Sequence, residues 1–243
     1  MKAISGIPAS YGIAIGPAFI FDRVEMVIET YSIDDSAAEW ARFEAAQVET
    51  RRQLDEAYQV TVEDCGEEAA EIFNAQKLML DDPELISGVK TAVENDKVNV
   101  ESALYKTSEA FASQLEAIED EYLSARALDI RDVSSRCLRN LIGLNDSPAA
   151  GLKTPSIIVS NDLTPSDTIL LDKELVLGFC TALGGSTSHT AILARGLGTP
   201  AVVGAGDQVK QINNGDNLII DGDSGQIIID PDQKTMDEQS VRM

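Results

Sequence analysis

The chain has 243 residues, of which 44% are hydrophobic, with 19 basic and 41 acidic residues and a formal net charge of −22. The length fits one large domain or two smaller ones, and the composition is that of a globular protein. The acidic balance argues against nucleic acid and anionic membranes as partners and favours a basic partner surface, unless the charge serves only to keep molecules apart.

No apolar run approaches the ~20 residues that span a membrane, and the N-terminus has no hydrophobic signal-peptide region. Cys65, Cys137 and Cys180 are far apart in the sequence and form no C-x-x-C pair. We therefore expect reduced thiols in a cytoplasmic protein, without a disulfide framework or a zinc site.

Residues 1–32 are predicted to be extended. Glycines at 6, 12 and 16 and prolines at 8 and 17 interrupt an otherwise apolar segment and forbid a long helix there.

Residues 33–145 are predicted to form an inserted all-helical unit of two long hairpins, because Ala, Glu, Leu, Gln and Arg dominate this stretch. Ser32 is the expected N-cap of the first helix, with Asp34 and Asp35 in its first turn. The expected breaks between helices fall at Gly66, at Pro83, at Asn95–Asp96 or Asn99, and ahead of a last helix over residues 122–141 that ends at Gly143.

Residues 146–230 alternate short apolar runs with helix signals. Strands are expected at residues 155–159, 174–180, 201–203, 217–221 and 226–230, the last two joined by a hairpin turn. Helices are expected to begin at Thr164, with Pro165 in the first turn, and at Thr190. We predict an α/β domain with a parallel sheet that combines residues 1–32 with 146–230, while residues 231–243 form a linker or start another helix.

His189 is the only histidine of the chain, and it stands between a double glycine and the start of a helix. Glycines permit close approach of another molecule, and the first turn of a helix offers unpaired N–H groups. An imidazole at this position tends to be neutral and nucleophilic. The sequence therefore predicts a nitrogen that accepts a phosphoryl group, with hydroxyls nearby to bind its oxygens: Ser186, Thr187, Ser188 and Thr190.

Other roles for His189 have less support. There is no second histidine or paired cysteine to complete a transition-metal site, and no G-x-S-x-G elbow of a serine hydrolase. An ordinary structural histidine is the plain alternative.

Four segments resemble the enzyme I family of the sugar phosphotransferase system, the phosphoenolpyruvate–protein phosphotransferases. They are residues 184–195 around His189, the N-terminal residues 4–14, the segment 162–168, and residues 120–132 of the last expected helix. The resemblance covers nearly the whole chain. It implies an α/β, swivelling phosphohistidine subdomain and an inserted helical subdomain that binds the phosphocarrier protein HPr.

The resemblance also implies roles for individual residues. His189 would be phosphorylated at Nε2, and Thr168 would hydrogen-bond and orient its ring. The phosphoryl group would lie against Gly184, Gly185, Thr187, Ser188 and Thr190. The family often has a basic residue where this chain has Ser186, so hydroxyls, backbone N–H groups or a basic residue of HPr would have to balance the charge.

Longer members of the family continue into a C-terminal barrel that binds phosphoenolpyruvate and Mg²⁺ and forms a homodimer. The chain is thus expected to be an N-terminal fragment without a cofactor, monomeric, and able to exchange phosphoryl groups only with HPr.

The HPr-binding face is expected where apolar residues are rimmed by acids in the helical block. Its members predicted from this pattern are Glu67, Glu68, Glu71, Leu78, Met79, Asp82, Glu84 and Leu85. The resemblance to the family adds Arg126 and Arg131, which match residues near the HPr interface. Gln76 takes the place of a histidine that is common in the family, so it cannot titrate. Three alternatives stay open: the swivelling domain of a pyruvate phosphate dikinase-like enzyme, the phosphoryl donor of a dihydroxyacetone kinase system, and a non-catalytic interaction module.

Overall fold

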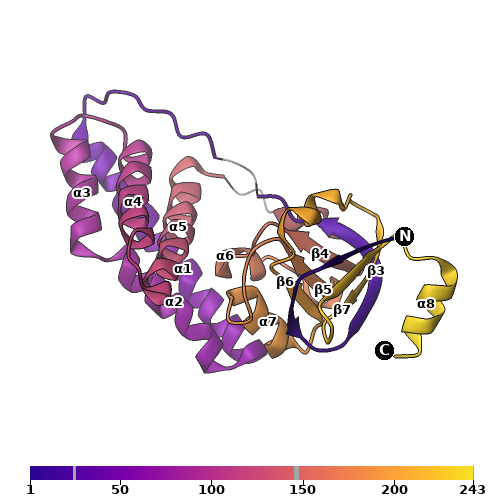
Figure 1. Cartoon of the computed structure of the whole chain (residues 1–243). Helices are drawn as coiled ribbons and strands as arrows, with labels where there is room; N and C mark the ends of the chain where they lie inside the picture. Colours follow the sequence, from indigo (N-terminus) through magenta and orange to yellow (C-terminus); the bar gives the residue numbers. More distant parts are fainter. Residues whose placement is uncertain (24–25, 145–147, 243) are drawn as a thin grey trace. The chain divides into compact units, whose positions relative to one another are not determined.

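A computed structural model describes residues 1–23, 26–144 and 148–242. It divides the chain into two compact units. The sheet unit comprises Met1–Val24, Val62–Ala69 and Ser147–Met243, and the helical unit comprises Glu25–Thr61 and Ala70–Asp146. This confirms a mixed α/β chain with an inserted helical part (Figure 1).

The sheet unit is built on eight strands. They are β1 (Lys2–Ser5), β2 (Ile7–Ser10), β3 (Ile13–Ile20), β4 (Ser156–Ser160), β5 (Val176–Thr181), β6 (Ala201–Val203), β7 (Asn217–Asp221) and β8 (Gln226–Ile229), in the order β1-β8-β7-β3-β4-β5-β6-β2. In the described residues, β3, β4, β5 and β6 are parallel neighbours and the other pairings are antiparallel. The predicted hairpin of β7 and β8 is confirmed. The expectation of a parallel sheet was wrong for the pairs β1–β8, β2–β6 and β3–β7, because strands far apart in the sequence carry no local signal of their relative direction.

The two outer strands of this order, β1 and β2, are consecutive in the chain and are separated only by Gly6. The sheet must therefore curl until its two edges meet. A Cβ on Gly6 would lie 2.6 Å from the carbonyl oxygen of Val203, so glycine is required where the strands come together. Closure leaves no long exposed sheet edge.

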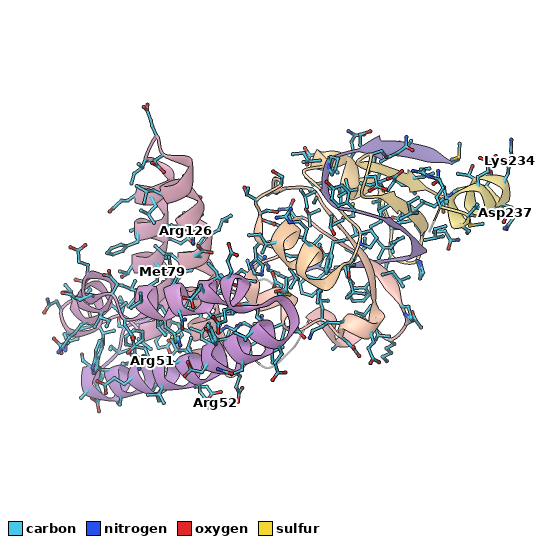
Figure 2. The ribbon with its side chains drawn as sticks, turned by 90° about the horizontal axis from the view of Figure 1, so that it is seen from below. Arg51, Arg52, Met79, Arg126, Lys234 and Asp237 are labelled. Atoms are coloured by element: carbon cyan, nitrogen blue, oxygen red, sulfur yellow. The ribbon has the colours of Figure 1, made fainter. Side chains whose placement is uncertain are left out.

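Alternating side chains fill the two sides of this sheet. Ile157 and Val159 of β4 belong to the interior cluster, whereas Ile158 between them packs with residues of the covering helices. The covering elements include α6 (Pro165–Thr168) and α7 (His189–Leu197). On the antiparallel part, Met236 of α8 (Gln233–Ser240) packs against Ile13, Ile219 and Ile228. The predicted linker thus contains a helix, from which Lys234 and Asp237 project (Figure 2).

The inserted helices are α1 (Ser36–Cys65), α2 (Glu67–Leu80), α3 (Pro83–Glu94), α4 (Val100–Glu116) and α5 (Glu121–Ile142), of which all but the end of α1 and the start of α2 belong to the helical unit. The break at Gly66 and the start at Pro83 agree with the sequence predictions. In α1, Phe43, Gln47, Thr50, Leu54 and Ala57 are buried at steps of three or four residues, the stripe of a helix packed on one face.

The expected N-cap of α1 was wrong. The Oδ1 atom of Asp35 accepts hydrogen bonds from the backbone N–H groups of Ala37 and Ala38, both at 3.0 Å. Ser32 instead pairs with Val98 in an isolated antiparallel bridge. A carboxylate caps a helix at least as well as a hydroxyl, and this one stands directly before the first helical residue.

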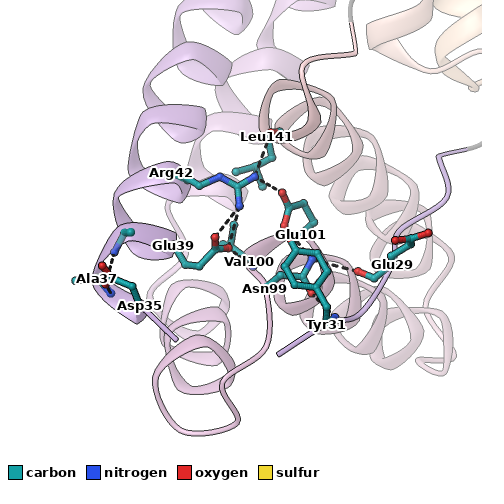
Figure 3. A network of polar contacts seen from close by, with 11 residues as sticks. Glu29, Tyr31, Asp35, Ala37, Glu39, Arg42, Asn99, Val100, Glu101 and Leu141 are labelled. Carbon is teal, nitrogen blue, oxygen red and sulfur yellow. Dashed lines mark hydrogen bonds and ion pairs between the residues drawn. The ribbon is translucent and has the colours of Figure 1, made fainter. Parts of the chain in front are cut away.

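The segment before α1 belongs to the helical unit. The prediction that residues up to 32 belong to the sheet unit was therefore wrong. Asn99 holds this segment, because its Oδ1 accepts from the backbone N–H of Tyr31 at 3.1 Å and its Nδ2 donates to the carbonyl of Glu29 at 3.1 Å. Asn99 also donates to Glu101, whose partner Arg42 is bound by Glu39 (Figure 3). This network joins the segment to α1 and α4.

The corner between α1 and α2 groups with the sheet unit. Asp64 forms an ion pair with Lys173, and a Cβ on Gly196 of α7 would lie 2.7 Å from Sγ of Cys65. All three cysteines are free thiols. In the described part of the chain, no helix combines the length and apolar character needed to cross a membrane.

Candidate functional site

Three loops that leave the parallel strands β3, β4 and β5 carry the candidate site. The carboxyl ends of neighbouring parallel strands lie at one edge of a sheet, which is where α/β proteins place their ligands. Arg23 follows β3, Asp167 and Thr168 follow β4, and His189 follows β5. Hydrogen bonds and an ion pair connect them.

His189 is the first residue of α7. Ser188 precedes it as the N-cap and accepts from the backbone N–H of Ala191 at 3.4 Å. Gly184 has a φ of +96°, and a Cβ there would lie 3.0 Å from Oγ of Ser188, so a glycine is required for the cap to form. Gly185 has open space where its Cβ would stand.

The imidazole of His189 is half-buried, and its Nε2 lies 3.3 Å from Oγ1 of Thr168. Burial lowers the pKa of His189 to about 4, although the negative charge of Asp167 acts in the opposite direction. The ring is consequently neutral near pH 7, which is the nucleophilic form.

The hydroxyl of Thr168 has two hydrogen-bond neighbours but only one proton. Oγ1 lies 2.9 Å from the carbonyl of Pro165, to which it donates, and 3.3 Å from Nε2 of His189. While the proton is directed to Pro165, the contact with His189 requires a proton on Nε2. In the nucleophilic tautomer the imidazole proton is on Nδ1. The Thr168 hydroxyl then either donates to Nε2 or keeps donating to Pro165, in which case no hydrogen bond joins it to His189.

Thr164, Pro165 and Asp167 fix the first turn of α6. Thr164 and Asp167 form a capping box, in which Oδ2 of Asp167 accepts from the backbone N–H of Thr164 at 2.8 Å. The same carboxylate accepts from Nε of Arg23 at 2.8 Å. Asp167 lies in the segment 162–168 that resembles the enzyme I family, whereas no sequence pattern indicated Arg23.

The predicted phosphoryl-binding hydroxyls differ in their accessibility. Ser186 and Thr187 are exposed, whereas Oγ of Ser188 is used as the helix cap. Thr190 is 0% exposed, and its hydroxyl is buried without a hydrogen-bond partner. Its side chain therefore cannot contact a ligand at the surface, which leaves only its backbone N–H for that role.

Arg195 supports the glycine-rich loop from the last turn of α7. Its Nη1 donates to the carbonyls of Ser186 at 2.9 Å and Ala9 at 3.0 Å. The arginine thus ties the loop before His189 to β2.

The predicted HPr-binding face is only partly exposed. Leu78 is 76% exposed, but Leu85 is 3% exposed and packs in the helical core, so its assignment to this face was wrong. Asp82 caps α3 by accepting from the backbone N–H groups of Glu84 and Leu85. Glu67, Glu68, Glu71 and Glu84 are exposed.

The two predicted arginines of α5 are both paired within the helical unit. Arg126 forms an ion pair with Asp129 at 2.8 Å, and Arg131 contacts Glu109 at 3.1 Å as well as Glu116. Arg126 and Met79 of α2 are labelled in Figure 2. Either arginine would have to loosen an existing ion pair in order to bind a partner.

Comparison with known proteins defines the class of protein. Residues 5–126 match the family model "PEP-utilising enzyme, N-terminal" and residues 152–225 match "PEP-utilising enzyme, mobile domain", so the chain belongs to the PEP-utilising enzymes. The phosphoenolpyruvate-protein phosphotransferase of Bacillus subtilis is 42% identical over 98% of the chain and 42% of its own length, and that of Geobacillus stearothermophilus is 44% identical over 95% and 40%.

A solution structure of an Enzyme I protein, nEIt, is 40% identical with a TM-score of 0.75, covering 98% of this chain and 97% of that one. The N-terminal domain of a nitrogen Enzyme 1 is 27% identical with a TM-score of 0.63, covering 98% of both chains. The chain belongs to the phosphoenolpyruvate-protein phosphotransferase, or Enzyme I, family. It spans about two fifths of the length of its curated relatives.

Proposed function

We propose that this chain carries a phosphoryl group on Nε2 of His189 and exchanges it with the phosphocarrier protein HPr, as the N-terminal part of a phosphoenolpyruvate-protein phosphotransferase. One observation carries the proposal: a neutral imidazole begins α7, and its Nε2 lies 3.3 Å from the Thr168 hydroxyl. The family membership supports it.

The transfer exchanges one P–N bond for another. The lone pair of Nε2 forms a bond to phosphorus while the bond to the donor imidazole of phosphorylated HPr breaks, and that electron pair returns to the donor nitrogen. Each ring keeps the proton on its other nitrogen, so no proton or electron is consumed and the reverse step is equivalent. Positioning and charge complementarity supply most of the catalysis in such a step.

Thr168 is assigned the role of orienting His189. Its hydroxyl holds the ring before transfer and must release the Nε2 lone pair for the attack. The transferred group then lies against the loop of Gly184, Gly185 and Thr187. Ser188 and Thr190 contribute through the backbone, because one hydroxyl is engaged in the cap and the other is buried.

HPr is expected to approach the exposed acids of α2 and α3. Leu78 supplies an apolar contact, and Glu67, Glu68 and Glu84 supply negative charge. With a net charge of −22, the chain favours encounter with a basic partner, and such steering acts mainly on the association rate.

We assign no cofactor to this chain. In longer family members, we expect the phosphoenolpyruvate-binding barrel to bind Mg²⁺ and to form the homodimer. The chain is then a monomeric cytoplasmic protein that uses phosphorylated HPr. The inserted helical unit argues against the swivelling domain of a dikinase-like enzyme.

Incubation with phosphorylated HPr tests the proposal. We expect an acid-labile, base-stable phosphate on the wild-type chain and none on His189→Ala, with circular dichroism to show that the variant is folded. A wild-type chain that stays unphosphorylated would favour the non-catalytic interaction module.

A further inference from the structure

We propose that Arg23 is a positioning residue for His189: it neutralises the buried carboxylate of Asp167 and holds the turn of α6 that presents Thr168. The inference rests on the proposed phosphoryl transfer at His189. It adds Arg23 to that site, although Arg23 lies outside both the glycine-rich loop and the segment 162–168.

The contacts of Arg23 span two of the three loops at the site. Nε donates to Oδ2 of Asp167 at 2.8 Å, and Nη2 donates to the carbonyl of Asp162 at 3.3 Å. The side chain of Arg23 is 48% exposed, while that of Asp167 is only 9% exposed. A carboxylate this well buried is costly without a partner, so the arginine matters more to Asp167 than an exposed ion pair would.

The same carboxylate oxygen organises the start of α6. Oδ2 of Asp167 accepts from the backbone N–H and from the hydroxyl of Thr164, both at 2.8 Å, in addition to Arg23. Thr168 is the next residue, and its hydroxyl reaches Nε2 of His189. Arg23 therefore acts on the imidazole indirectly: its charge-assisted hydrogen bond holds Asp167, Asp167 fixes the first turn of α6, and that turn presents the Thr168 hydroxyl.

Charge gives the second argument. Asp167 is close enough to His189 for its negative charge to act on the imidazole. A phosphoryl group brings about −1.5 to −2 further charges near pH 7, which an unpaired carboxylate would repel. Ser186 offers no cation in the loop before His189, whereas Arg23 supplies one directly on Asp167.

The chain offers a closely matched control. Arg242 is 51% exposed and forms an ion pair at 3.2 Å with Asp221, whose side chain is 9% exposed. Both pairs belong to the sheet unit, but Asp221 holds the turn before β8 through the backbone N–H groups of Asp223 and Ser224. Arg242→Gln thus removes an equivalent ion pair that has no link to His189.

The test compares wild type, Arg23→Gln, Arg242→Gln and the double variant Arg23→Gln/Asp167→Asn. Single-turnover transfer from phosphorylated HPr is measured together with the His189 pKa by NMR titration. We expect Arg23→Gln to slow transfer about tenfold, as for the loss of a charge-assisted hydrogen bond, and to raise the His189 pKa. The double variant should return the pKa toward that of wild type, because the carboxylate charge is gone.

Arg242→Gln should transfer like wild type and leave the His189 pKa unchanged. Wild-type rate and pKa in Arg23→Gln, or equal losses in both arginine variants, would overturn the inference while leaving the proposed function intact. If the wild-type chain accepts no phosphoryl group, the proposed function fails instead, and the NMR titration alone decides whether Arg23 acts on His189.

Discussion

Burial shifts the pKa of Asp129 in the helical unit and the pKa of His189 in the sheet unit in opposite directions. In the helical unit, burial raises the pKa of Asp129 to about 6, with Arg126 opposing the shift and Asp132 adding to it. In the sheet unit, burial lowers the pKa of His189 to about 4.

The cause is the same in both units, because desolvation favours the uncharged form of any group. For the carboxyl of Asp129, the uncharged form is the protonated acid, and ionisation above pH 6 opposes folding. For His189, it is the free base, which is the form that attacks phosphorus. Burial therefore keeps His189 of the sheet unit in its nucleophilic form, whereas the ionisation of buried Asp129 lowers the stability of the helical unit.

The largest expected effect removes the nucleophile. His189→Gln should abolish phosphoryl acceptance from phosphorylated HPr while the fold persists, because glutamine is polar and similar in length. Acceptance is followed by acid-labile phosphate, and the fold by circular dichroism and thermal unfolding. If the variant is unfolded, His189 is primarily a structural residue.

The two buried groups should give opposite dependences of stability on pH. Between about pH 4 and 6.5 the unfolded chain binds a proton at His189 that the folded chain does not, so this group makes stability rise with pH. Between about pH 4 and 6 the folded chain holds the proton on Asp129 that the unfolded chain has lost, so that group makes stability fall with pH. Each group changes the free energy of unfolding by up to about 3 kcal/mol across its pH range. The change from His189 is the smaller one, because its side chain is half-buried and partly screened by solvent.

Urea unfolding at several pH values separates the two contributions. Relative to wild type, Asp129→Asn should make stability rise more steeply between pH 4 and 6, and His189→Gln should make it fall more steeply. If either variant keeps the wild-type pH profile, the corresponding group is not perturbed by burial. The double variant should show neither contribution, since the two residues lie in different units.

The docking face and the chemical site should respond to different measurements. Reversing three exposed acids of α2 and α3, Glu67→Lys, Glu68→Lys and Glu84→Lys, should slow association with HPr roughly tenfold at low salt, with a shallower salt dependence. Asp82 is left unchanged because it caps α3. Stopped-flow association measures the effect.

A control triple variant keeps the total charge change the same. Asp207, Asp237 and Glu238 are exposed residues of the sheet unit that belong to neither α2 nor α3, and their replacement by lysine changes the net charge equally. Equal slowing in both triple variants would mean that total charge, and not this face, steers the partner.

The sequence predicted the five helices well, because Gly66 and Pro83 interrupt otherwise strong helix formers. It predicted the hairpin of β7 and β8 but not the antiparallel pairs β1–β8, β2–β6 and β3–β7, since short apolar strands that are distant in the sequence carry no sign of their relative direction. It also did not predict the role of Asp35 over Ser32 as helix cap. Leu85 was assigned to the surface because the acids around it hid the buried stripe of α3.

Within the site, His189 and Thr168 could be paired through a family resemblance, and the structure brings them to 3.3 Å. Arg23 could not be found in this way, because it lies 144 residues from Asp167 in the chain. Only the position of the carboxyl end of β3 beside that of β4 brings the two together. The local signal that could have drawn attention to Arg23 is an arginine shortly after the apolar strand that ends at Ile20, separated from it by Phe21 and Asp22.

The smallest expected effect concerns the Thr168 hydroxyl. Thr168→Val keeps the shape of the side chain in its buried position but removes the hydrogen bonds to His189 and to Pro165. A side-chain hydrogen bond contributes roughly 0.5–1.5 kcal/mol net, so transfer should slow by roughly two- to twelvefold at about 1.4 kcal/mol per factor of ten. Affinity for unphosphorylated HPr should barely change, because Thr168 is buried and is not one of the exposed acids of α2 and α3. Single-turnover transfer measured beside equilibrium binding separates the two effects. An unchanged transfer rate would leave Thr168 as a structural residue of α6, and a parallel loss of rate and affinity would indicate a disturbed sheet unit. A loss of rate alone would show that the loops after the parallel strands carry the chemistry, whereas the exposed acids of α2 and α3 carry the encounter with HPr.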